Sequence, residues 1–250
     1  MYQPRTYRRC VHSPGLISYA VVERETDLLI STITNLEREA RVLVRELRQT
    51  LEDYIVHTPY FAASLEPVDV PEDAPPIVQE MAAAAKKAGV GPMAAVAGAI
   101  AQSVGRALSL LSPEIIVENG GDIYLKSQKN RLAAIYAGNS PLSGALGIEI
   151  PASETSVGIC TSSATVGPSL SFGRTDAAVA VASSVALADA AATAIGNAVS
   201  SAEEIDRGLM VAQGIPGLRG AVIIVGDKLG VWGNLHLQVF QGRTKPQPAP

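Results

Sequence analysis

Two glycines and a carboxylate follow an apolar run in the middle of the chain, where a buried strand would end. The run covers residues 115–117 and leads through a glutamate into Asn119-Gly120-Gly121-Asp122. Glycine has no Cβ and adopts positive φ at little cost, so its N–H can approach a ligand closely. Asn119 and Asp122 add directional donors and acceptors. The segment either holds a polar ligand or is a tight turn that only needs glycine.

A second chemical signal is a carboxylate and a hydroxyl four residues apart in an alanine-rich stretch, Asp189 and Thr193. The composition favours a helix, so the two side chains share one helical face. Such oxygen ligands suit Mg²⁺, with substrate phosphates and water completing its coordination. The structural alternative is an aspartate near a helix N-terminus and a threonine bonded to a carbonyl one turn earlier.

With both segments in this order, the chain resembles the ApbE-like family, the FAD:protein FMN transferases, over about residues 26–239. Residues 90–99 and 160–163 look closer still to a cytoplasmic branch of ApbE-like paralogues of obscure function. The resemblance implies that Asp189 and Thr193 bind the metal. It also implies a set of cofactor-binding residues, namely Gly98, Ala99, Asn119, Gly120, Gly121, Asp122, Thr161, Ser162 and Ser163.

Two departures from the transferases bear on activity. Gln102 stands where they carry a lysine, and residues 169–173 stand where they carry a histidine. The chain has no histidine between His57 and His236. The expected fixed cation and imidazole are therefore missing. We expect the binding site to be retained and classical flavin transfer to a protein to be lost, which leaves open whether the chain is an enzyme.

Cys160 precedes Thr161 at the end of an expected strand and is, with Asp189, a candidate catalytic residue. A thiolate there could attack an activated substrate or carry sulfur, but only if a cation or a helix terminus lowers its pKa. No histidine lies nearby in the sequence, and strand alternation can bury the sulfur. An inert core cysteine is the alternative.

The composition excludes several classes of function. A formal charge of −4 argues against nucleic-acid binding. Arg5, Arg8 and Arg9 could dock an anion or form a solvated N-terminus.

The N-terminus lacks a signal-peptide core, and no apolar run reaches the length of a membrane span. The two cysteines support neither a disulfide framework nor a structural zinc site. We expect a cytoplasmic protein.

The hydrophobic pattern predicts an α+β protein with a mixed, largely antiparallel sheet. Strands are expected at residues 16–22, 28–32, 115–118, 132–137, 147–150, 157–161, 177–182, 221–225, 229–232 and 235–240. Helices are expected at 36–55, 77–88, 93–111, 185–199 and 202–213, and a proline-punctuated loop at 59–76. No Gly-x-Gly-x-x-Gly follows the first strand, which disfavours a Rossmann fold. The resemblance implies an ApbE-like fold of two intertwined halves, with one domain at 1–243 and a proline-rich tail at 244–250.

Two functions follow as hypotheses. In the first, the chain binds FAD, FMN or another phosphate-bearing small molecule with Mg²⁺ and carries out metal-assisted cleavage or transfer at a pyrophosphate. In the second, the resemblance implies a non-catalytic accessory protein in anaerobic sulfur assimilation, in homocysteine formation from sulfide, beside a redox or sulfur-assimilation protein partner. The apolar helices make a homodimer a mild expectation.

Overall fold

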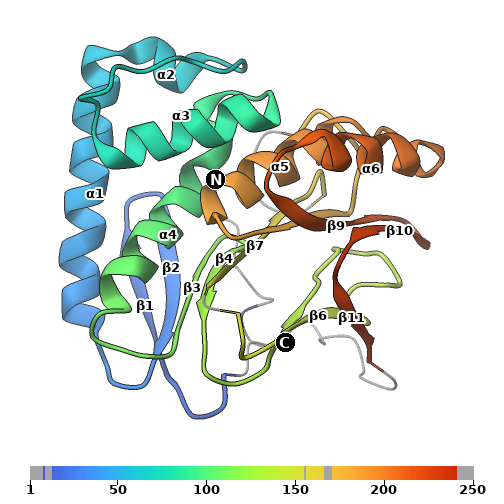
Figure 1. Ribbon diagram of the computed structural model, residues 1–250, viewed down its shortest axis with the longest axis horizontal. Coiled ribbons are helices and arrows are strands. Elements are labelled where there is room, and N and C mark those ends of the chain that lie inside the picture. The colour runs from blue at the N-terminus through green and yellow to red at the C-terminus, as the bar shows by residue number, and fades with distance from the viewer. Residues whose placement is uncertain (1–7, 9–12, 155, 166–170, 241–250) are drawn as a thin grey trace.

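The computed structural model describes residue 8 and residues 13–154, 156–165 and 171–240. In this part of the chain a large antiparallel sheet carries a layer of helices on one face, and a small sheet covers part of the other face (Figure 1). One hydrophobic core lies between the helices and the large sheet, and a second lies between the two sheets.

The large sheet has the strand order β1-β2-β3-β4-β7-β8-β9-β10, and every pairing in it is antiparallel. Its strands are β1 (Ile17–Glu23), β2 (Thr26–Thr32), β3 (Ile115–Asn119), β4 (Asp122–Lys126), β7 (Val157–Ser162), β8 (Ala177–Ala182), β9 (Leu218–Val225) and β10 (Lys228–Gly233). The small sheet has the order β11-β6-β5, with β5 (Arg131–Ala134), β6 (Leu146–Ile150) and β11 (His236–Val239).

The helical layer is built from six α-helices and two short 3₁₀ turns among the described residues. They are α1 (Glu37–His57), α2 (Pro59–Ala63), α3 (Pro76–Ala88), η2 (Pro92–Ala95), α4 (Val96–Leu108), α5 (Val185–Asn197), η3 (Ala202–Glu204) and α6 (Ile205–Gly214). Within the described residues no single helix is long and apolar enough to cross a membrane; one pair, 76–88 with 92–108, reaches that length and composition only with a bend of 104°.

Strand alternation explains the two cores, because successive side chains of a strand point to opposite faces of the sheet. Ala178, Ala180 and Ala182 of β8 belong to the core under the helices, whereas Val179 and Val181 belong to the core between the sheets. All six residues of β8 are buried. This central strand therefore reads as a continuous apolar run in the sequence.

Small residues on the helix-facing side of β7 and β8 let α5 approach the sheet closely. A Cβ at Gly158 would lie 2.6 Å from Cα of Val185, the first residue of α5. The facing positions of β8 are alanines. The alanines of α5 itself complete a tight helix-to-sheet contact, which fixes the place of every side chain on that helix.

Several expected elements differ from the structure. Residues 122–126 form a strand, β4, which is not among the expected strands, and the expected loop at 59–76 begins with helix α2. The helix expected from residue 93 begins as the 3₁₀ turn η2. The strand expected at 235–240 was assigned to the main sheet, but β11 pairs with β6 in the small sheet. The expected tail at 244–250 lies outside the described residues.

Candidate functional site

The candidate site begins at the two-residue turn that joins β3 to β4. Asn119 pairs with Asp122 across this hairpin, and Gly120 and Gly121 have φ values of 71° and 108°. Positive φ at both central positions is what a tight hairpin turn requires and is what glycine permits. The turn thereby brings Asn119 and Asp122 side by side, with both residues buried.

The side chain of Asn119 reaches the start of α4. Its Nδ2 donates to the carbonyl oxygen of Ala97 at 3.1 Å. Gly98, the next residue, donates its N–H to Oδ2 of Asp189 at 2.8 Å. The first N–H groups of a helix have no acceptor within the helix, so Asp189 of α5 supplies one from outside. The hairpin turn, the start of α4 and the side of α5 thus meet at one place.

Gly98 is required at this meeting point by space. A Cβ there would lie 2.6 Å from the carbonyl oxygen of Val185 and 2.7 Å from Cβ of Asp189. Both distances are shorter than real Cβ contacts, and one of the two atoms belongs to the backbone. The resemblance implied that Gly98 binds the cofactor; in the structure its lack of a Cβ permits the close approach of α5.

Two carboxylates influence each other within this cluster. Burial raises the pKa of Asp189 well above its ordinary value, and the charge of Asp122 raises it further, while the N–H groups of Gly98 and Ala97 act in the opposite direction. Like charges disfavour simultaneous ionisation. The pair therefore favours a proton or a cation beside it.

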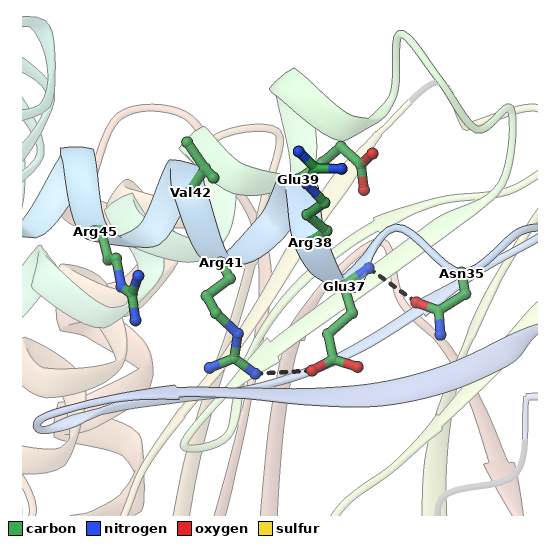
Figure 2. A pocket seen from close by; sticks show the side chains of 7 residues that line it. All are labelled: Asn35, Glu37, Arg38, Glu39, Arg41, Val42 and Arg45. Atoms are coloured by element: carbon green, nitrogen blue, oxygen red, sulfur yellow. Dashed lines mark hydrogen bonds and ion pairs between the residues drawn. The ribbon is translucent and has the colours of Figure 1, made fainter.

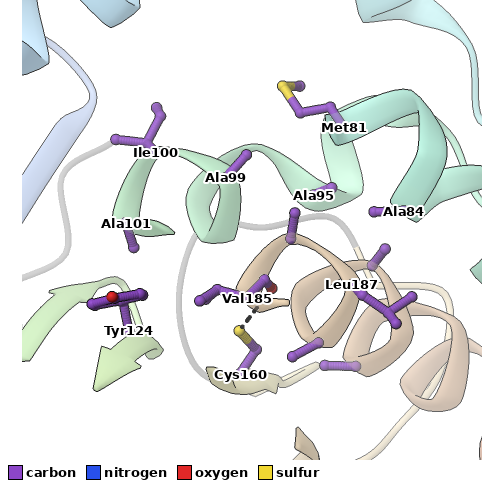
Figure 3. Close-up of a cluster of buried hydrophobic side chains, with 14 of the residues drawn as sticks. Met81, Ala84, Ala95, Ala99, Ile100, Ala101, Tyr124, Cys160, Val185 and Leu187 are labelled. Carbon is purple, nitrogen blue, oxygen red and sulfur yellow. Dashed lines mark hydrogen bonds between the residues drawn. The ribbon is translucent and has the colours of Figure 1, made fainter. Parts of the chain in front are cut away.

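Cys160 lies in the same cluster but is fully buried, with its Sγ 3.4 Å from the carbonyl oxygen of Val185 (Figure 3). Burial raises the pKa of this thiol well above the ordinary value, and the charges of Asp122 and Asp189 raise it further. A nucleophilic thiolate needs the opposite environment. The surroundings of Cys160 favour the core-cysteine alternative.

One N–H of the glycine turn already has a partner. Oε1 of Glu118 accepts a hydrogen bond from the N–H of Gly121 at 2.8 Å, and Oε2 of Glu118 accepts one from Nε of Arg8. Arg8 also donates to Asp27, with 2.6 Å between Nη1 and Oδ1. Burial alone would lower the pKa of Arg8, but the two carboxylates outweigh it and raise the pKa. Arg8 thus docks carboxylates of its own chain; Arg5 and Arg9 lie outside the described residues.

The remaining expected cofactor residues are less closely grouped. Ala99 is fully buried in the core among the helices, near Ala95 in Figure 3, so no part of it is exposed to a ligand. Thr161 adjoins the turn, where its carbonyl oxygen would lie 3.6 Å from a Cβ at Gly121. Ser162 lies against α5, with Oγ 3.5 Å from a Cβ at Gly196. Ser163 follows β7, and its Oγ accepts the N–H of Thr165 at 3.1 Å.

The expected metal ligands lie on α5, and both are half-buried. Thr193 follows Asp189 by one turn on the same face. Among the described residues, no group of three or more histidines, cysteines or carboxylates is arranged to hold a metal ion. A metal at Asp189 would accordingly need oxygen atoms from a ligand and from water.

Sequence reasoning singled out Gln102 only for the missing lysine and did not foresee its contacts. Gln102 is almost completely buried, and it bonds to Val185 of α5 and to Glu80 of α3. No local sequence pattern announces these partners, because they are 83 and 22 residues away.

A shallow pocket with a volume of about 620 Å³ lies away from these residues, along the first turns of α1 (Figure 2). Its arginines are largely engaged: Arg41 pairs with Glu37 at 2.7 Å, and Arg45 pairs with Glu23 at 3.0 Å. Such exposed pairs contribute little to stability or recognition. This surface contains none of the residues that the sequence proposed for the site.

A family model described as "AbpE bacteria" matches residues 8–213 of this chain. A UPF0280 protein of Methanocella arvoryzae is 47% identical over 193 residues, which cover 77% of this chain and 78% of that protein. A UPF0280 protein of Methanocaldococcus jannaschii is 42% identical over 221 residues, covering 86% and 90%.

Solved structures share the fold at low sequence identity. The ApbE protein of Thermotoga maritima superposes with a TM-score of 0.57 at 10% identity, over 86% of this chain and 96% of that one. The apo form of the flavinyl transferase ApbE of Pseudomonas stutzeri gives 0.54 at 14% identity, over 87% and 93%. The prediction of an α+β, ApbE-like fold is confirmed.

Proposed function

This chain belongs to the family described as AbpE bacteria and thus to the ApbE-like superfamily, and from that premise we propose that it binds a flavin nucleotide or another phosphate-bearing small molecule together with Mg²⁺. FAD and FMN are the first candidates, because flavin transferases share the fold. The observation that carries the proposal is the position of Asp189, which accepts the N–H of Gly98 at the start of α4 within reach of the charge of Asp122.

The residues present fit a magnesium ion. A divalent cation beside Asp189 offsets both the burial of its charge and the repulsion from Asp122, which together raise its pKa. Mg²⁺ is commonly held by one or two carboxylates, with phosphate oxygens and water completing an octahedron. Asp189 and Thr193 would hold the ion.

The hairpin turn would receive the polar head of the ligand. The side-chain amide of Asn119 lies there, beside the start of α4, whose N–H groups at Ala97 and Gly98 are bonded to Asp189. A ligand oxygen seeking the N–H of Gly121 would compete with Glu118, which already accepts it. We therefore expect Asn119, Asp122 and the N–H of Gly120 to matter more for affinity than Gly121.

If the chain is catalytic, cleavage or transfer at a pyrophosphate is the reaction that this arrangement suits. A bound Mg²⁺ supplies stabilisation of the negative charge that develops on a leaving phosphate. The part of the chain's own residues is to orient the phosphates against α4 and to exclude water, since Asn119 and Asp122 are buried. Cys160 has no nucleophilic part in this proposal.

The test is titration of the purified protein with FAD, with and without MgCl₂, by isothermal calorimetry. We expect binding to depend on Mg²⁺ and to be lost in Asp189→Asn, which keeps the shape of the side chain and removes its charge. Thr193→Val should weaken the Mg²⁺ dependence by less, because a neutral hydroxyl is the weaker ligand.

Asp206→Asn is the matched control, because Asp206 is an exposed carboxylate in the first turn of another helix, α6. It should bind as the unchanged protein does. Equal FAD affinity in Asp189→Asn and in the unchanged protein, with both folded by circular dichroism, would refute the proposed site.

A second candidate function is that of a non-catalytic accessory protein, and Gln102 favours it. Its amide is neutral and bonds to protein groups at both ends, so this position supplies no cation to a phosphate. In this candidate, the protein would act in anaerobic sulfur assimilation, as the resemblance implies, beside a redox or sulfur-assimilation partner in the cytoplasm. Mass analysis of small molecules released from freshly purified protein separates the two candidates: a tightly held nucleotide supports the first, and an empty protein with a stoichiometric partner supports the second.

A further inference from the structure

Gln102 joins three helices through a single buried amide. Its side chain lies on α4, one turn after Gly98, and the residue is 2% exposed. Oε1 accepts the N–H of Val185 at 2.7 Å, and Nε2 donates to Oε2 of Glu80 on α3 at 2.9 Å. Both ends of the amide therefore have a defined partner.

The bond to Val185 is one of two successive bridges between α4 and α5. Gly98 meets Asp189, and four residues later on α4 Gln102 meets Val185, which is four residues earlier on α5. Residues four apart lie on one face of a helix. The two hydrogen bonds are therefore adjacent links between helices that run in opposite directions. A shift of α5 that changes one of these bonds also changes the other.

Val185 is enclosed on its other sides by small residues. Sγ of Cys160 lies 3.4 Å from its carbonyl oxygen. A Cβ at Gly98 would lie 2.6 Å from the same oxygen, and a Cβ at Gly158 would lie 2.6 Å from Cα of Val185. These contacts limit how close α5 can come to α4 and β7. The N–H of Val185 begins the helix and has no acceptor within it, and Gln102 supplies that acceptor.

We propose that Gln102 is a positioning residue that sets α5 at the height where the carboxylate of Asp189 meets the N–H of Gly98 and stands beside Asp122. The effect of Gln102 on Mg²⁺ affinity rests on the proposed function. The effect of Gln102 on the Gly98–Asp189 hydrogen bond does not depend on that function. Glu80 positions Gln102 in turn, since it determines which end of the amide faces Val185.

An exchange of polarity tests the proposal. Gln102→Glu replaces the hydrogen bond to Glu80 by repulsion between two carboxylates, which displaces the side chain from the position in which it accepts the N–H of Val185. Adding Glu80→Gln restores a donor and acceptor pair with the direction reversed. Glu80→Gln alone is the matched control, since it keeps Gln102 and removes the charge that also pairs with Arg106.

The first readout is hydrogen exchange at the Gly98 amide, measured by NMR relative to the free energy of global unfolding of each variant. We expect Gln102→Glu to lower protection of Gly98 specifically and the double variant to recover it. The second readout is Mg²⁺ affinity in the presence of FAD, which should fall about tenfold in Gln102→Glu, as changes behind a metal ligand commonly do, and recover in the double variant.

Unchanged Gly98 protection in Gln102→Glu, or no recovery in the double variant, would overturn the positioning role. If the unchanged protein binds no Mg²⁺, the proposed function fails, while the exchange of the Gly98 amide still decides the role of Gln102. A loss of protection spread evenly over all amides would show that Gln102 only adds general stability and would also overturn the proposal.

Discussion

At the scale of single residues, the candidate site contains groups whose pKa differs from the ordinary value. Asp189 and Cys160 both have a raised pKa, because burial and neighbouring carboxylates disfavour their anionic forms. For Asp189 a cation removes the penalty, which is what a metal site needs. For Cys160 burial is the largest cause, a backbone hydrogen bond of Ile123 offsets it only in part, and the thiol stays protonated at neutral pH.

The first residue-scale prediction concerns the reactivity of Cys160. In a Cys10→Ser background, where Cys160 is the sole thiol, the folded protein should react with iodoacetamide only very slowly at pH 8. A buried, protonated thiol is a poor nucleophile. Reaction in urea should be rapid, which provides the internal control. Rapid labelling of the folded protein would contradict the core-cysteine assignment.

The second residue-scale prediction concerns a buried ion pair outside the site, Glu114 with Arg131. Burial by itself raises the pKa of Glu114, but Arg131 and the hydroxyl of Ser127 outweigh it, so the pKa lies below the ordinary 4.5. A carboxyl whose pKa is lower in the folded state stabilises the protein above the unfolded-state pKa, and this stability is lost as the pH falls through the folded-state pKa.

Urea unfolding as a function of pH measures this contribution. The unchanged protein should lose stability below about pH 4.5, and Glu114→Gln should lose less over the same range. Arg131→Met should destabilise the protein at pH 7 by about 3–5 kcal/mol, because it leaves a buried carboxylate without its cation. Combining it with Glu114→Gln should recover most of that loss; identical pH profiles for the unchanged protein and Glu114→Gln would contradict the account.

At the scale of elements, the site exists because α4 and α5 come unusually close. Gly98 is the contact that permits this, and Gly98→Ala should destabilise the protein by about 1–3 kcal/mol through overpacking and also weaken Mg²⁺-dependent FAD binding. Denaturant unfolding and calorimetry check the two effects.

Gly214→Ala is the matched control for Gly98→Ala. Gly214 ends α6, and a Cβ there would meet no atom within 4 Å. The change should leave FAD binding unaltered and stabilise the protein by a few tenths of a kcal/mol, up to about 1 kcal/mol. Equal destabilisation by both alanines would mean that helix contact at Gly98 is not the cause.

The sequence predicted most elements, because their hydrophobic periods are regular. It missed β4, because Asp122 and Ile123 directly follow the Gly-Gly turn and resemble a loop; the pairing of Ile123, Tyr124 and Leu125 with β7 identifies the strand. It placed the strand at 235–240 in the main sheet, because the alternation of apolar and polar residues along a strand does not indicate which strand it pairs with. The grouping of Asn119, Asp122 and Asp189 followed from the resemblance. The bonds of Gln102 and of Glu118 to the same elements depend on distant backbone groups and could not be predicted locally.

At the scale of the whole molecule, the two hydrophobic cores support the large sheet from opposite faces. The core between the sheets stiffens the far side of β4, β7 and β8, while the helical core presses α4 and α5 onto their near side. The candidate site lies at the end of this near side, where the β3–β4 turn reaches the start of α4. A rigid sheet below and two bridged helices above can hold a small ligand with little loss of conformational entropy.

The most direct measurement of the central claim is a crystal structure of the protein soaked with FAD and MnCl₂, collected at a wavelength where manganese scatters anomalously. We predict an anomalous peak beside the carboxylate of Asp189, within coordinating distance of a phosphate oxygen, and no such peak in Asp189→Asn. Bound FAD whose manganese lies away from Asp189, or a saturated crystal with neither metal nor nucleotide at the β3–β4 turn, would contradict the account.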